Sequence, residues 1–110
     1  SVPCGAGAET LMHQAGFQPA PDTLEEDVKA VLTKIELGEA DAGLVYLTDV
    51  VAAGDKVEGI EVPEAAGVVN RYPIAVTTGA PNPEGARAWV DFVLSDEGQA
   101  ALAAAGFVSP

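Results

Sequence analysis

The stretch from Glu25 to Asp49 constrains the fold more than any other part of this 110-residue chain. Apolar side chains recur there at the helical positions i, i+3, i+4 and i+7, while charged and polar ones fall mostly opposite. These apolar residues are Val28, Val31, Leu32 and Ile35. Gly38 supplies a C-terminal stop, and the nearly all-apolar run 42–46 predicts a short strand buried on both faces. A helix that runs into a buried strand predicts an α/β fold.

The start of this helix has two interpretations. The Thr23-x-x-Glu26 pattern of a capping box places the N-cap at Thr23. Val28 would then lie beyond the first turn, and its N–H would be bonded to the carbonyl four residues earlier. A start nearer Glu25 leaves the Val28 N–H available to a ligand.

The rest of the chain predicts further helices and strands. Asn82 is a strong N-cap because Pro83 follows it at the first helical position, and Ser95 caps a last helix. The predicted helices, besides the one that ends near residue 37, cover residues 5–15, 48–53, 83–94 and 96–105. The predicted strands, besides 42–46, cover residues 57–62 and 68–78.

Composition excludes several classes of function. The net charge of −12, from 17 acidic and 5 basic residues, disfavours nucleic acid, because phosphate binding needs Lys and Arg contacts. One cysteine and one histidine give no metal-ligand cluster, and no nucleophile, base and orienting residue form a recognisable catalytic arrangement. We therefore expect no enzyme. Since the chain opens at Ser1 without Met or a signal segment, we expect it to be part of a longer polypeptide.

Several short stretches form a recognisable series along the chain: Val2-Pro3-Cys4-Gly5, Glu26-Asp27-Val28, Gly43-Leu44-Val45-Tyr46 with Thr48-Asp49, Tyr72-Pro73-Ile74-Ala75-Val76, and Asp91-Phe92-Val93-Leu94-Ser95 with Gly106-Phe107. Taken in this order, they resemble the extracytoplasmic molybdate-binding proteins of ABC transporters. The resemblance implies a type II periplasmic-binding-protein fold, with a three-layer α/β lobe built on a mixed sheet. Residues 1–67 are then most of the second, ligand-binding lobe, and 68–78 form a crossing or hinge strand. Residues 79–110 are helices that return to a first lobe, which is absent.

The same resemblance implies a site for a tetrahedral oxyanion, molybdate or tungstate. On this lobe the anion is expected to be held by the main-chain N–H of Cys4, the main-chain N–H of Val28 and the hydroxyl of Tyr46. The other hydroxyl donors belong to the absent lobe. Many relatives have Ala where this chain has Cys4, and a main-chain donor tolerates that change. No catalytic residue, cofactor or metal beyond the oxyanion itself is implied.

Neutral donors are compatible with the acidic composition. Surface charges farther away than a Debye length of about 10 Å are largely screened, whereas a helix N-terminus presents unpaired N–H groups and about half a positive charge. A site made only of donors also favours a fully ionised anion, because a protonated one would set a donor against a donor. We therefore expect no Lys or Arg at the anion.

The implied function is an extracytoplasmic solute-binding protein, periplasmic or lipid-anchored, that delivers molybdate to a membrane permease. The alternative is a ligand-sensing effector domain of a transcription regulator with the same fold. Residues 1–110 alone are expected to bind weakly, since half of the donors are missing. A bare apolar face on the helix from Asn82 to Leu94 would invite association. The missing lobe, a swapped copy or a refolding of the helices could cover that face.

Overall fold

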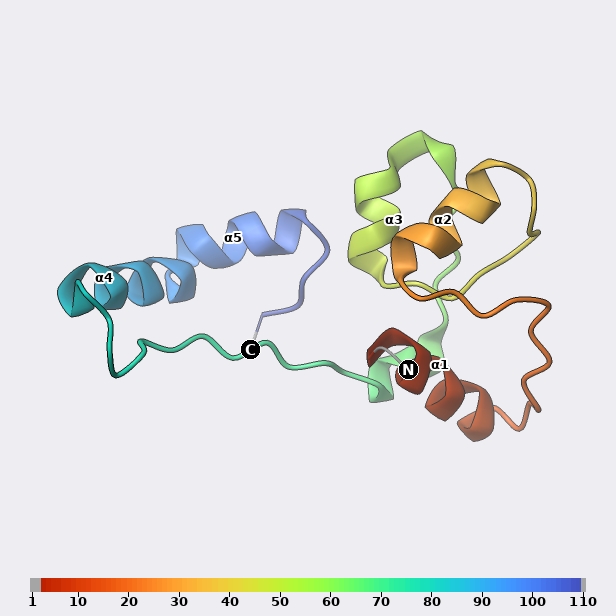
Figure 1. Cartoon of the computed structure of the whole chain (residues 1–110), viewed down its shortest axis with the longest axis horizontal. Coiled ribbons are helices and arrows are strands. Elements are labelled where there is room, and N and C mark those ends of the chain that lie inside the picture. Colours follow the sequence, from red (N-terminus) through yellow and green to blue (C-terminus); the bar gives the residue numbers. More distant parts are fainter. Residues whose placement is uncertain (1–2, 110) are drawn as a thin grey trace. The chain divides into compact units, whose positions relative to one another are not determined.

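The computed structural model describes residues 3–109 and falls into two compact units, the first ending at Asn70 and the second beginning at Arg71 (Figure 1). The first unit holds α1 (Pro3–Gln14), α2 (Val28–Glu36), α3 (Leu47–Ala53) and the 3-10 helices η1 (Gly54–Lys56) and η2 (Pro63–Gly67). The second holds α4 (Pro83–Leu94) and α5 (Asp96–Ala104). The boundary lies inside the predicted crossing segment 68–78, whose role as a hinge stays a prediction.

The two C-terminal helices begin where their capping residues predict. The Asn82 side-chain oxygen accepts from the Gly85 N–H at 2.9 Å, with Pro83 as the first residue of α4. The Ser95 hydroxyl likewise accepts from the Gly98 N–H at 3.2 Å at the start of α5. Gly106, at φ 91, follows α5 in the left-handed conformation that ends many helices. These sequence predictions are confirmed.

In the first unit, segment 42–46 contacts both α1 and α2. A Cβ atom added to Gly43 would lie only 2.5 Å from Val31 Cγ1 on α2, so only glycine fits there without movement. One residue later, the Leu44 carbonyl oxygen lies 3.8 Å from the Cys4 thiol on α1. Helix α2 also contacts α3, and α1 contacts η2. This segment therefore contacts both α1 and α2 and ends at Tyr46, at the start of α3.

The predicted mixed sheet is not confirmed, because no strand occurs among residues 3–109. Segments 42–46, 57–62 and 68–78 form no ladder, and Figure 1 draws no arrow for them. Val57 and Val62 do have extended backbone angles. The physical reason is that an apolar run can favour an extended backbone by itself, but a strand also needs a neighbouring strand to pair its N–H and C=O groups.

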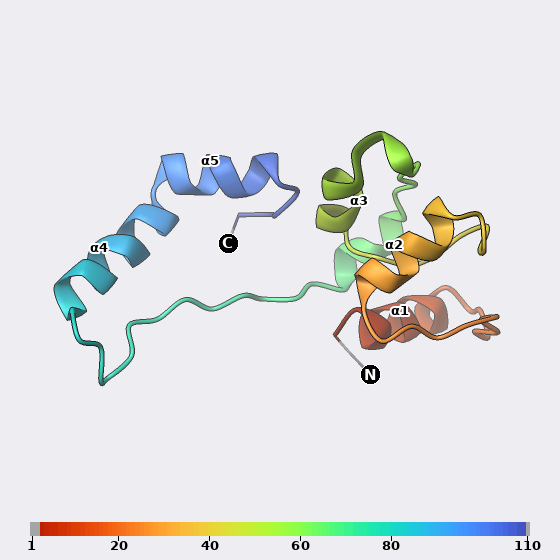
Figure 2. The same ribbon diagram turned by 45° about the horizontal axis from the view of Figure 1, so that its top comes forward.

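In the second unit, α5 runs on from α4 after an open bend (Figure 2). A Cβ atom on Gly98 would overlap the main-chain carbonyl oxygens of Phe92 and Val93, so this junction requires glycine. The Gln99 amide donates to the Val93 carbonyl at 2.8 Å across the junction. The apolar face of α4 is exposed, as predicted: Trp89 is 61% exposed and stacks on Phe92 at 5.6 Å between ring centroids.

Candidate functional site

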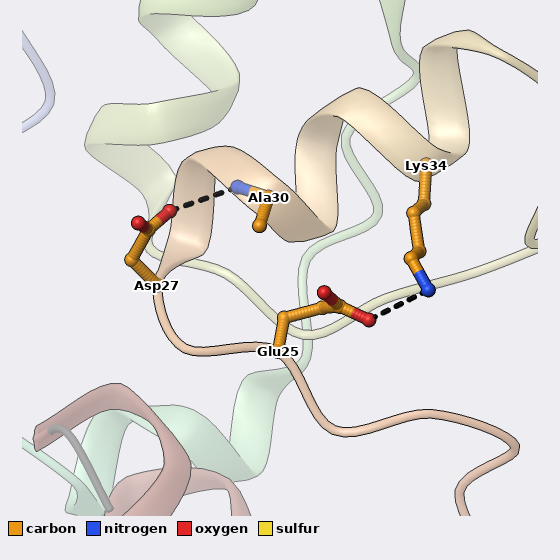
Figure 3. Close-up of polar contacts among 4 residues, drawn as sticks. All are labelled: Glu25, Asp27, Ala30 and Lys34. Atoms are coloured by element: carbon orange, nitrogen blue, oxygen red, sulfur yellow. Dashed lines mark hydrogen bonds and ion pairs between the residues drawn. The ribbon is translucent and has the colours of Figure 1, made fainter.

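The start of α2 leaves the Val28 N–H without an in-helix acceptor. Val28 is the first residue of the helix, and its N-cap is Asp27 in an extended conformation (φ −147, ψ 167). The Asp27 carboxylate accepts from the Ala30 N–H at 2.9 Å (Figure 3). Among residues 3–109, no carbonyl accepts the Val28 N–H. The Val28 N–H is therefore not used within the helix, which is the condition for its donation to an anion.

The predicted capping box at Thr23 is wrong, and a start near Glu25 is also too early. Asp is a stronger N-cap than Thr, and Asp27 lies one residue before the first turn of α2. The Glu25 carboxylate is used instead in an ion pair, 2.8 Å from Lys34 Nζ (Figure 3). This contact ties the chain before the helix to the last turn of the same helix.

The carboxylates near this helix start are engaged away from the Val28 N–H. Hydrogen bonding from Lys34, and then from Thr23, lowers the pKa of Glu25 below its ordinary value of 4.5. The same hydrogen bond raises the pKa of Lys34 above 10.5. Asp27 caps Ala30, and Glu26 is exposed to solvent, where its charge is screened. An anion at the Val28 N–H would therefore meet carboxylates that already have partners or are hydrated.

Cys4 lies at the start of α1. As the second residue of the helix, it places its main-chain N–H in the first turn, where such groups have no partner within the helix. Its thiol faces the Leu44 carbonyl, and burial, followed by the nearby charge of Asp49, raises the pKa of the Cys4 thiol. The thiol is therefore protonated at neutral pH and acts as a small packing group. Val2, which opens this motif, lies outside the described residues.

Tyr46 is the N-cap of α3 rather than the end of a paired strand. Its main-chain N–H donates to the Asp49 carboxylate at 3.0 Å, which fixes the backbone at this point. Its hydroxyl accepts a hydrogen bond of 2.7 Å from the side-chain amide of Asn70, 24 residues farther along the chain. The phenol is half-buried, whereas Asn70 is exposed. Both side chains belong to the first unit.

A small hollow of about 100 Å³ joins two of the three predicted ligand residues. Its wall contains Cys4, Tyr46 and Asn70 together with apolar groups from α1, from the segment before α3 and from η2 and the residues after it. Val28 does not line this hollow. The structure therefore brings Cys4 and Tyr46 together and places Val28 on a neighbouring helix of the same unit. The sequence reasoning missed Asn70, because no motif links it to a tyrosine so far away in sequence.

The described residues contain neither a metal-ion cluster nor a membrane-spanning helix. No three His, Cys, Asp or Glu side chains within residues 3–109 converge in a way that would hold a metal ion. No helix in this part of the chain is long and apolar enough to cross a membrane. The chemistry on offer at the hollow and at the start of α2 is hydrogen-bond donation from main-chain N–H groups and from a phenol.

Comparison with known proteins places these observations in a family context. A family model described as bacterial extracellular solute-binding protein matches residues 1–108. The molybdate-binding proteins ModA of Mycobacterium tuberculosis (strain H37Rv) and Mycobacterium bovis are each 41% identical to this chain over 110 residues. A Bacillus subtilis (strain 168) protein, YvgL, provisionally named an ABC transporter substrate-binding lipoprotein, is 30% identical over 115 residues.

The matches cover the whole of this chain but less than half of each relative. All of the chain aligns with 42% of the mycobacterial proteins, and 99% of it aligns with 43% of the Bacillus protein. No solved structure matches the chain. The alignments therefore relate these 110 residues to part of each relative, and they do not cover the rest of those proteins.

Proposed function

Since the chain belongs to the family of bacterial extracellular solute-binding proteins, we propose that its residues form part of a protein that captures molybdate or tungstate for import by an ABC transporter. The observation that carries the proposal is the 41% identity to molybdate-binding proteins over all 110 residues. In the proposed protein, residues 1–67 supply most of one lobe and 68–78 cross between lobes. Residues 79–110 return to the other lobe, whose hydroxyl groups complete the site.

On this lobe the proposed donors are the main-chain N–H groups of Cys4 and Val28 and the hydroxyl of Tyr46. Support for Val28 comes from its position as the first residue of α2, where its N–H has no in-helix acceptor. Support for Cys4 and Tyr46 comes from their joint presence in the wall of one hollow. Neutral donors bind a dianion well when they are preorganised, because the bonds to a charged acceptor are stronger than bonds between neutral groups.

The proposed cycle contains binding and release without covalent chemistry. Capture takes place outside the cytoplasm, and closure of the two lobes around the anion presents the loaded protein to the membrane permease. The oxyanion is cargo, and no cofactor is needed. Selectivity over sulfate follows from size, because an anion that is too small leaves donors unpaired in a desolvated site.

Calorimetric titration tests the proposal. The natural polypeptide that carries residues 1–110 is titrated at its full length with sodium molybdate, sodium tungstate and sodium sulfate. Tight binding of the first two, with sulfate much weaker, is the expected result. Absence of tight binding to both molybdate and tungstate would overturn the proposal, whereas equal binding of all three anions would overturn its account of selectivity.

A further inference from the structure

A side-chain hydrogen bond joins Asn70 to the hydroxyl of Tyr46, and both residues line the same hollow. The Asn70 Nδ2 atom lies 2.7 Å from the phenolic oxygen, a short distance for a neutral N–H···O bond. The two residues are 24 positions apart in the sequence, so the contact is a product of the fold and not of a local turn. Asn70 is also the last residue of its unit.

The direction of this bond matters for the chemistry of the phenol. An amide N–H that donates to the phenolic oxygen uses a lone pair of that oxygen. It does not use the phenol's own O–H, which is a donor. A hydroxyl that accepts such a bond becomes a somewhat stronger donor, because chains of hydrogen bonds polarise one another. The contact therefore favours donation by Tyr46, which is the role proposed for it toward an oxyanion.

Burial argues against a purely structural explanation. Asn70 is exposed, so water can replace its bond to Tyr46 if the contact is broken. No desolvated polar group would then be left unpaired, and folding has little to gain from this contact. A bond of this kind has its main effect on the orientation of the phenol.

We infer that Asn70 is a positioning residue of the oxyanion site, which holds the Tyr46 hydroxyl in place and polarises it for donation to the anion. This inference rests on the proposed function and deepens it, because it names a residue that acts on the anion through another side chain. Asn70 and Tyr46 both belong to the first unit, so the bond lies within that unit.

A double-mutant cycle tests the inference. Molybdate is titrated into the full-length natural polypeptide as wild type, Asn70→Ala, Tyr46→Phe and the double variant. Asn70→Ala is expected to lower the affinity about threefold to tenfold, the effect of one net hydrogen bond. In the Tyr46→Phe background the same change is expected to have no effect, because the hydroxyl through which it acts is gone. A residue with a merely structural role would lower the affinity in both backgrounds.

Two controls keep the outcomes separate. Gln18→Ala removes an exposed amide of the same unit and is expected to leave affinity unchanged. Asn70→Ser, whose side chain is too short to reach the phenol, should reproduce Asn70→Ala, and thermal melting of both variants should match the wild type. Unchanged affinity in Asn70→Ala, or an equal loss in both backgrounds, overturns the inference while the proposed function stands. A wild type that does not bind molybdate overturns the proposed function as well.

Discussion

Helices α2 and α4 begin in nearly the same way and differ by a single N–H group. In both, an Asx side chain caps the helix by accepting from the third helical N–H at 2.9 Å, from Asp27 in α2 and from Asn82 in α4. The first helical residue is Val28 in α2 and Pro83 in α4. Proline has no N–H, so the first position of α4 offers no donor, whereas the first position of α2 does. The same capping chemistry therefore only starts the helix in α4, whereas in α2 it also leaves a potential donor to an anion.

The two helices also differ in what lies against their apolar faces. Val31 of α2 is approached so closely by Gly43 that no side chain fits between them. On α4, Trp89 and Phe92 are 61% and 44% exposed. The helix with a donor at its start is thus the one that is held in place by a neighbouring segment.

Replacing Val28 with Pro would make the start of α2 like that of α4. The helix should persist, because Asp27 already has the extended conformation that a residue before proline prefers. Loss of a donor to a charged acceptor is expected to weaken molybdate binding by about 1.5–3 kcal/mol, which is about 10- to 100-fold. Calorimetry on the full-length polypeptide measures this effect.

Two matched variants complete this comparison. Val28→Ala removes the side chain but keeps the N–H, and it should retain most of the affinity. Pro83→Ala restores an N–H at the start of α4 and should leave binding unchanged. Wild-type affinity in a folded Val28→Pro variant would remove Val28 from the site and make the two helix starts equivalent.

Gly43→Ala tests whether segment 42–46 holds α2. The added Cβ would lie 2.5 Å from Val31 Cγ1, and β-branched Val has little freedom to turn away. We expect a loss of about 1–3 kcal/mol in the free energy of unfolding, measured by urea denaturation. Shortening the neighbour by Val31→Ala should recover part of this loss. As a control, Gly5→Ala in α1 adds a Cβ that meets nothing within 4 Å apart from its chain neighbours and the nearby backbone of its own helix, and it should not destabilise the protein.

Removing the caps separates their structural role from binding. Asp27→Ala and Asn82→Ala should each reduce the free energy of unfolding by about 1 kcal/mol, because each leaves a first-turn N–H without its acceptor. Only Asp27→Ala is expected to weaken molybdate binding as well, since fraying of α2 moves the Val28 N–H. Equal effects of the two variants on affinity would contradict the difference between the helices.

How far the sequence predicts the structure depends on the range of the interactions involved. The starts of α4 and α5 follow from Asn82 and Ser95, because a cap acts within three residues. Two local signals compete at the start of α2, and Asp27, the stronger N-cap, is the residue that caps it, while Glu25 pairs with Lys34. The sheet was expected from apolar runs, yet pairing requires a second strand, which no local pattern supplies.

The candidate site shows the same division. The prediction that Cys4, Val28 and Tyr46 are site residues came from a resemblance, and the geometry at Val28 depends on a local cap. The Asn70 contact with Tyr46 joins residues 24 positions apart, so only three-dimensional structure reveals it. Local chemistry therefore predicts how a donor is presented, and long-range packing decides which side chains support it.

The smallest expected effect concerns the ion pair between Glu25 and Lys34. Among the described helices, only α2 has an ion pair to a residue just before its first turn. The folded-state pKa of Glu25 is lowered, so its stabilising contribution is present above its ordinary value of 4.5 and is lost as the pH falls through the folded-state pKa. The pKa of Lys34 is raised, so its contribution is present below 10.5 and is lost as the pH rises through the folded-state pKa.

Urea unfolding of wild type and Glu25→Gln across pH should therefore show a constant difference in the free energy of unfolding near neutrality that disappears in acid. The difference should be small, because partly solvated ion pairs contribute little. The same series with Glu84→Gln in the first turn of α4 serves as the matched control. A Glu25→Gln difference that persists unchanged in strong acid would show that the side chain stabilises the start of α2 by packing rather than by its charge.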